Sequence, residues 1–183
     1  IYGVYYGMMI AMLFYNLFIL AMVRGRDYLY YVLYVAGALL TSLTIDGFGA
    51  SHLWPGEPRF SITSFYNFMT NILYLLLTRE LLITKINTPF LDKIALANIA
   101  FCSGGFLANL FLMNNLTMSV LSLVCTAITI VTAISMVVVT LHRGVRLARF
   151  YLVSLTFILA GALVYVLRVL DLIPVNLITM WSL

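Results

Sequence analysis

The chain has 183 residues, of which 64% are hydrophobic and only 9% are charged, and its mean hydropathy is +1.10. Soluble domains carry about a quarter charged residues and need a polar surface, so this composition excludes an ordinary soluble protein and indicates an integral membrane protein. The formal net charge of +4 does not require nucleic acid as a partner, because basic residues hold the loops of membrane proteins in the cytoplasm.

The first predicted membrane span covers residues 2–23. It contains no charged residue and ends at Arg24-Gly25-Arg26-Asp27. A charge-free run of this length crosses a hydrocarbon core of roughly 30 Å as a helix. Three small residues at four-residue spacing form a stripe for close helix packing, and they are Gly3, Gly7 and Ala11. Because Ile1 is not a start methionine and no signal-peptide pattern precedes the span, we expect a piece of a longer chain.

Five more complete spans and the start of another are predicted downstream, which gives an all-α, polytopic membrane bundle made of one module. They cover residues 28–48, 60–82, 94–113, 117–141 and 150–170, with a partial seventh span at 175–183. Asp46-Gly47 ends the second span with helix-terminating chemistry. Asn114-Asn115 is a turn short enough to require an antiparallel return into the membrane.

The distribution of basic residues predicts the orientation. Loops after the first, third and fifth spans carry eight of them: Arg24, Arg26, Arg79, Lys85, Lys93, Arg143, Arg146 and Arg149. The opposite side carries only Arg59 and Arg168. Positively charged loops stay in the cytoplasm, so the N-terminus is predicted to lie outside.

Asp46 is the ionisable residue that suggests most about function, because a carboxylate near the end of an apolar helix is costly unless it is solvated or paired. Arg59 and Arg168 are predicted to lie on the same side and are candidate partners. One interpretation is that Asp46 lies at headgroup level and terminates its helix with Gly47. The other is that Asp46 belongs to a polar cluster that links the outer loops to the bundle.

Asn16, Asn67 and Asn71 lie within predicted spans, where an amide needs a partner on another helix because lipid offers none. Structural hydrogen bonding is the simpler interpretation, and a buried polar site whose rearrangement carries a signal is the alternative. Ser122, Thr126 and Thr129 share one face of the fifth span, and such hydroxyls usually bond backbone carbonyls of their own helix.

Sequence patterns for catalysis are absent, and we expect neither an enzyme nor a cofactor or metal site. His52 and His142 are assigned to opposite sides, and no HExxH, phosphate loop or serine elbow occurs. Cys102 and Cys125 fall in apolar segments. We expect them at depths that differ by roughly 10 Å, too far apart for a disulfide.

Several short motifs together resemble the membrane module of bacterial seven-transmembrane receptors with diverse intracellular signalling modules. They are Tyr5-Tyr6-Gly7, Tyr15-Asn16-Leu17, Tyr28-Leu29-Tyr30-Tyr31, Asp46-Gly47 with Trp54-Pro55, Thr78-Arg79-Glu80-Leu81-Leu82 with Pro89 and Leu91-Asp92, and Ile173-Pro174. The resemblance covers essentially all 183 residues. It implies a bacterial cytoplasmic membrane location, a ligand-binding domain before the module and a kinase, diguanylate cyclase or phosphatase after it.

The leading hypothesis is therefore a non-catalytic receptor module. The resemblance implies two-component or cyclic-di-GMP signalling. The module could be a monomer or a homodimer. A transporter or channel lined by Asn16, Asn67 and Asn71 is the alternative. It lacks the broken helices and midplane charges expected of such proteins. A membrane enzyme is a third hypothesis, and it lacks a reactive set of residues.

Overall fold

The computed structural model describes residues 2–49, 59–112, 115–145, 148–153 and 156. Within these residues the structure is helical and contains no strand. The helices are α1 (Tyr2–Val23), α2 (Arg26–Ile45), α3 (Arg59–Leu81), α4 (Thr84–Asn87), α5 (Pro89–Leu112) and α6 (Asn115–His142). The chain divides into two compact units, residues 1–136 and 137–183, so that α6 passes from one unit into the other.

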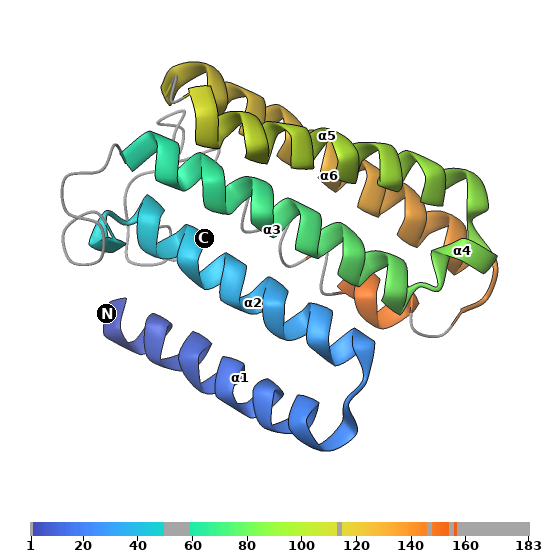
Figure 1. Ribbon diagram of the computed structural model, residues 1–183. Helices are drawn as coiled ribbons and strands as arrows, with labels where there is room; N and C mark the ends of the chain where they lie inside the picture. The colour runs from blue at the N-terminus through green and yellow to red at the C-terminus, as the bar shows by residue number, and fades with distance from the viewer. Residues whose placement is uncertain (1, 50–58, 113–114, 146–147, 154–155, 157–183) are drawn as a thin grey trace, which may run out of the picture. The chain divides into compact units, whose positions relative to one another are not determined.

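The long helices of the first unit lie side by side (Figure 1). α1 packs against α2, α2 against α3, and α3 against α5. The first part of α6 also contacts α3, since the hydroxyls of Ser64 and Ser119 lie 3.2 Å apart. α3 thus has neighbours on several sides, whereas α1 lies at the edge of the unit and exposes most of its apolar side chains.

Four of the described helices are long and apolar enough to cross a membrane: Gly3–Val23, Arg26–Ile45, Pro89–Phe111 and Thr117–His142. α3 has 23 residues but is not among the four. Its sequence contains polar residues such as Thr70 and Asn71, which bond to side chains of α2 and α6 instead of facing lipid. The protein is therefore a multi-pass membrane protein, and six complete spans with a partial seventh stay a prediction.

The boundaries of the long helices lie within five residues of the predicted spans. α1 coincides with the predicted span 2–23. α2 begins two residues before the predicted residue 28 and ends three residues before 48. α5 begins at Pro89 and not at residue 94, because proline is well suited to the first helical position. The predicted span began after the charged residues Asp92 and Lys93, whereas α5 begins before them.

The core of the first unit contains a buried cluster of Phe68, Cys102 and Cys125. The expected difference in depth between the two cysteines is therefore wrong. Cys102 lies ten residues before Leu112 at the end of α5, and Cys125 lies ten residues after Asn115 at the start of α6. Antiparallel helices with equal counts from a shared turn bring both residues to the same level. Both cysteines are free thiols in the structure.

In the second unit, α6 ends at His142 and Gly144 follows with φ of 79°. A left-handed glycine directly after a helix is a common terminator, because it lets the backbone turn away without a Cβ clash. Residues 148–153 are helical again, two residues before the predicted start of the span 150–170. Apart from residue 156, the rest of that span lies outside the described residues, and so does the partial span 175–183.

Candidate functional site

A cluster of two amides and one hydroxyl joins α3 to α6. Asn71 Nδ2 donates to Asn67 Oδ1 at 2.8 Å and to Thr126 Oγ1 at 2.9 Å. Thr126 Oγ1 donates in turn to Asn67 Oδ1 at 3.1 Å. Asn67 and Asn71 face the same way because they are one helical turn apart. The structure thus brings both asparagines together with a threonine that sequence analysis had paired only with its own helix.

The cluster offers more acceptors than hydrogens. Asn71 Nδ2 carries two hydrogens but has three acceptors within reach. These are Asn67 Oδ1, Thr126 Oγ1 and the backbone carbonyl oxygen of Asn67, which lies 3.0 Å away. The single hydroxyl hydrogen of Thr126 faces two, because the Ser122 carbonyl lies 2.9 Å away. Not all of these bonds exist at once, so the cluster can change its bonding pattern with little movement of the helices.

A second polar contact joins α5 to α6. Asn98 Nδ2 donates to Thr129 Oγ1 at 3.1 Å, and the Cys102 thiol lies 3.6 Å from Asn98 Oδ1. Ser122 donates to the Ser119 carbonyl at 2.9 Å, as expected of a hydroxyl in a membrane helix. Thr129, on the same face, instead accepts a bond from the neighbouring helix. Asn98 was not among the site residues predicted from the sequence.

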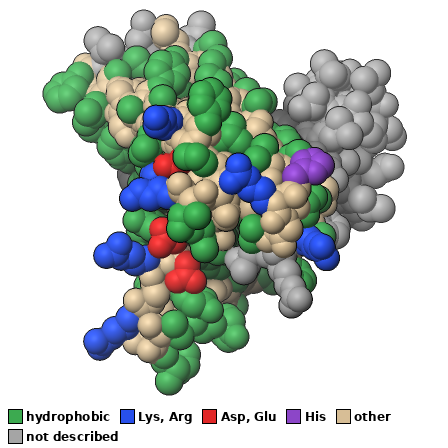
Figure 2. All heavy atoms as spheres, turned by 90° about the vertical axis from the view of Figure 1, so that its right-hand side faces the viewer, with side chains coloured by type: hydrophobic (Ala, Val, Ile, Leu, Met, Phe, Trp, Pro, Cys, Tyr) green, Lys and Arg blue, Asp and Glu red, His purple; other side chains and the backbone are tan. Residues whose placement is uncertain are grey.

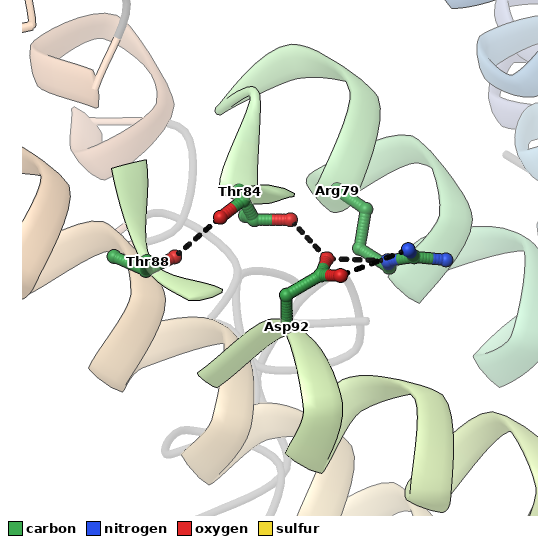
Figure 3. A network of polar contacts seen from close by, with 4 residues as sticks. All are labelled: Arg79, Thr84, Thr88 and Asp92. Carbon is green, nitrogen blue, oxygen red and sulfur yellow. Dashed lines mark hydrogen bonds and ion pairs between the residues drawn. The ribbon is translucent and has the colours of Figure 1, made fainter. Parts of the chain in front are cut away.

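An ion pair closes the end of the first unit where α3, α4 and α5 meet (Figure 3). Arg79 Nε lies 2.7 Å from Asp92 Oδ1, and Arg79 Nη2 lies 3.1 Å from Asp92 Oδ2. Thr84 Oγ1 donates to Asp92 Oδ1 at 2.5 Å. The side chains of Arg79 and Asp92 are 18% and 8% exposed. This bidentate ion pair fixes both the distance and the angle between the helix ends.

The connection between α3 and α5 is held in a strained backbone conformation. Ile83 has φ of 47° and ψ of 50°, in the left-handed region that a β-branched residue rarely adopts. Asn87 Nδ2 donates to the Leu82 carbonyl at 2.7 Å, and Thr88 Oγ1 lies 3.4 Å from the Thr84 carbonyl. These bonds and the ion pair together hold the break between the two helices.

At the opposite end of the helices, Asp46 follows α2 and accepts a hydrogen bond from the Tyr6 hydroxyl of α1. The Tyr6 ring also lies 6.4 Å from the ring of Phe48, measured between centroids. Gly47 has φ of 79°, so Asp46 and Gly47 do terminate α2. Asp46 therefore ends α2 and bonds to α1, while its depth in the membrane and its place in a polar cluster with the outer loops stay predictions.

The remaining predicted site residues are not brought into these contacts. Asn16 Nδ2 donates to the Met12 carbonyl of its own helix at 2.8 Å. Arg59 begins α3 but its side chain is outside the described part of the chain, and Arg168 lies outside it entirely. The stripe of Gly3, Gly7 and Ala11 is exposed on α1, and a Cβ added at either glycine would meet no atom within 4 Å. In the described structure no helix packs there, and its role in packing stays a prediction.

Close packing occurs instead at two glycines that sequence analysis missed. A Cβ at Gly105 would lie 2.7 Å from Phe68 Cε1, and a Cβ at Gly37 would lie 3.0 Å from Thr70 Oγ1. Thr41 and Thr70 place their hydroxyls 3.0 Å apart beside Gly37. For Gly37, its position inside an apolar span, four residues before Thr41, was the available signal; Gly105 has no hydroxyl residue at that spacing.

Comparison with known proteins assigns the chain to a family. The family model for 7TM diverse intracellular signalling matches residues 1–183. The chain belongs to this family. The resemblance inferred from the short motifs is thus confirmed, and the family indicates a transmembrane sensor module. Neither a curated protein nor a solved structure matches the chain.

The structure connects two of the motifs that resemble the family. Thr78-Arg79-Glu80-Leu81-Leu82 and Leu91-Asp92 are separated in the chain, yet Arg79 and Asp92 form the ion pair that joins α3 to α5. In the sequence both motifs marked the resemblance, and Arg79 also counted as a basic residue for the orientation. Opposite charges at the end of one span and at the start of the next were the signal that could have paired them.

Proposed function

We propose that the chain is the transmembrane part of a bacterial receptor, which conveys the binding of a ligand outside the cytoplasm to an output domain that follows it in a longer chain. The output is a kinase, a diguanylate cyclase or a phosphatase, and the module itself catalyses no reaction. The chain lies in the cytoplasmic membrane with its N-terminus outside, and crosses it six times before a seventh helix. Family membership over residues 1–183 supports this proposal.

The observation that carries the mechanism is that α3 is bonded to three neighbouring helices at different positions along its length. Thr70 bonds to Thr41 of α2, Asn71 to Thr126 of α6, and Arg79 to Asp92 of α5. Packed helices move as bodies between discrete arrangements. A shift of α3 therefore has to be matched by its partners, and the excess of acceptors around Asn71 and Thr126 allows a second arrangement at little energetic cost.

The signal enters through α1 in this mechanism. α1 continues the chain from any domain that precedes it, and its Tyr6 hydroxyl bonds Asp46 at the end of α2. A pull or rotation at the outer end of α1 reaches α2 through this bond. α2 packs along α3, so the movement then spreads to the inner connections.

The test is the activity of the output domain in membranes that contain the full-length protein. Thr126→Ala removes the hydroxyl that links α6 to Asn71, and a coupling of 1–3 kcal/mol corresponds to a change in output of roughly 5- to 150-fold. Thr126→Ser keeps the hydroxyl and should stay close to the original level. Val131→Ala, on an exposed position of the same helix, is the matched control.

Equal output from Thr126→Ala, Thr126→Ser and the unsubstituted protein, at equal amounts in the membrane, would remove this cluster from the mechanism. The transporter alternative has less support, because the Asn71 amide is engaged by Asn67 and Thr126 and the Asn16 amide by the Met12 carbonyl. Uptake of a radiolabelled sugar or amino acid by vesicles that contain the full-length protein would revive it.

A further inference from the structure

The short connection between α3 and α5 exposes an unusual combination of side chains. Ile86 and Phe90 are 76% and 74% exposed, and Lys85 and Lys93 beside them are exposed as well. We propose that these four residues, the connection surface, form a docking site for anionic phospholipid headgroups. The site takes the headgroup on its lysines and the upper part of the acyl chains on its apolar side chains.

The connection surface is rigid before any ligand arrives. Arg79 and Thr84 hold the Asp92 carboxylate, and Asn87 holds the Leu82 carbonyl. These bonds keep Ile86 and Phe90 directed outward, although a flexible connection would be free to fold large apolar side chains inward. A preformed site loses less conformational entropy when it binds.

The charge of this end of the first unit favours an anionic partner. Figure 2 looks at this end and shows Lys and Arg side chains gathered there, with fewer acidic ones among them. The α1–α2 and α3–α5 connections carry five basic residues, namely Arg24, Arg26, Arg79, Lys85 and Lys93. They carry three acidic residues, namely Asp27, Glu80 and Asp92. Asp92 is already paired with Arg79. Within the described residues, Lys85 and Lys93 have no ion-pair partner.

The position along the helices favours lipid over a protein partner. Phe90 is the second residue of the candidate span Pro89–Phe111, and α4 has only four residues. At 1.5 Å per helical residue, Ile86 lies within about 6 Å of the span along the chain. Side chains that lie in the interface insert about 5–10 Å into the boundary between headgroups and acyl chains. Apolar and basic side chains at this depth suit that boundary.

The depth of the connection surface can be tested with tryptophan fluorescence. Full-length Phe90→Trp is reconstituted into phosphatidylcholine vesicles with brominated acyl chains, and the emission of the unsubstituted protein, which contains Trp54 and Trp181, is subtracted. Strong quenching by bromine and weak quenching by aqueous iodide are expected. Quenching by iodide alone would overturn the proposal. Loss of both kinds of quenching would show that a protein domain covers the surface, which overturns it equally.

The charge preference is tested with the same full-length protein. Lipid adducts are counted by native mass spectrometry after reconstitution in mixtures of phosphatidylglycerol and phosphatidylcholine. Lys85→Gln with Lys93→Gln should weaken the preference for phosphatidylglycerol by roughly fivefold per lysine. Arg24→Gln with Arg26→Gln, which removes two exposed cations from the other connection, is the matched control and should have less effect. An equal loss of the phosphatidylglycerol preference in both double variants would show that the general surface potential, and not this site, attracts the lipid. That result would overturn the proposal.

Discussion

Gly105→Ala tests how closely α3 and α5 approach each other. The added methyl group would lie 2.7 and 2.8 Å from Phe68 Cε1 and Cζ. The Phe68 side chain is fully buried, and Ile72, Phe106 and Leu121 pack around its cluster. A tilt of the ring would therefore press against these neighbours. Gly104→Ala is a matched control on the same helix, because its Cβ would meet nothing within 4 Å.

The two substitutions differ only in the steric clash. Alanine is favoured over glycine within a helix by about 1 kcal/mol, and both variants gain this. Overpacking of a well-filled core costs about 1–3 kcal/mol, and only Gly105→Ala incurs it. Gly105→Ala should therefore be less stable than Gly104→Ala by about 1–3 kcal/mol, which corresponds to a factor of roughly 5 to 150 in the population of the opened form.

The buried thiols of Cys102 and Cys125 provide the assay, since both residues are free and 0% exposed. The full-length protein in detergent is exposed to a thiol reagent, and modification of the two cysteines is followed by peptide mass spectrometry. Gly105→Ala should be modified faster than Gly104→Ala by the factor given above. Equal rates in the two variants would show that α3 and α5 do not pack at Gly105 as described.

Two further predictions concern the ends of the helices. Asp92→Ala removes the carboxylate that binds Arg79 and Thr84. Because the ion pair is only partly exposed, this substitution should destabilise the connection by about 2 kcal/mol and accelerate hydrogen exchange over residues 82–88. Glu80→Gln, at an exposed position, should leave this exchange unchanged. Tyr6→Phe removes the donor to Asp46 at an exposed site, which should cost about 1 kcal/mol and accelerate exchange in α1 but not in α5. Unchanged exchange in either variant would contradict the corresponding contact.

Hydropathy and charge predicted where the long helices of the described residues lie in the sequence, but not which side chains meet. The span 2–23 matches α1 because Arg24 and the charges after it mark its end. α3 is a different case, since its polar residues lower its hydropathy and are tolerated only because other helices surround it. The predicted span 60–82 lies within one residue of α3 at each end, but the helices that cover its polar residues were not predicted.

The pairing of residues across helices depends on depth and rotation, and an apolar sequence leaves both undetermined. Lipid and neighbouring helices are both apolar surroundings, so periodicity does not separate them as it does in a soluble protein. The stripe of Gly3 and Gly7 was predicted to pack and is open in the described structure, whereas Gly105, in an equally apolar span, is the one covered by Phe68. For the same reason Asn71 was recognised as a candidate, but its bond to Thr126 was not.

The left-handed conformation of Ile83 also bears on how the chain assembles during synthesis. A left-handed residue with a Cβ costs about 1–2 kcal/mol, and neither glycine nor proline requires the break at this position. The break depends on Asp92, which is synthesised thirteen residues after its partner Arg79. Until Asp92 emerges from the ribosome, the chain up to Asn87 is free to continue α3 as a straight rod. The break at Ile83 therefore forms late, from a contact between two helices, whereas Pro89 acts through the local sequence and keeps a longer α3 from continuing into α5.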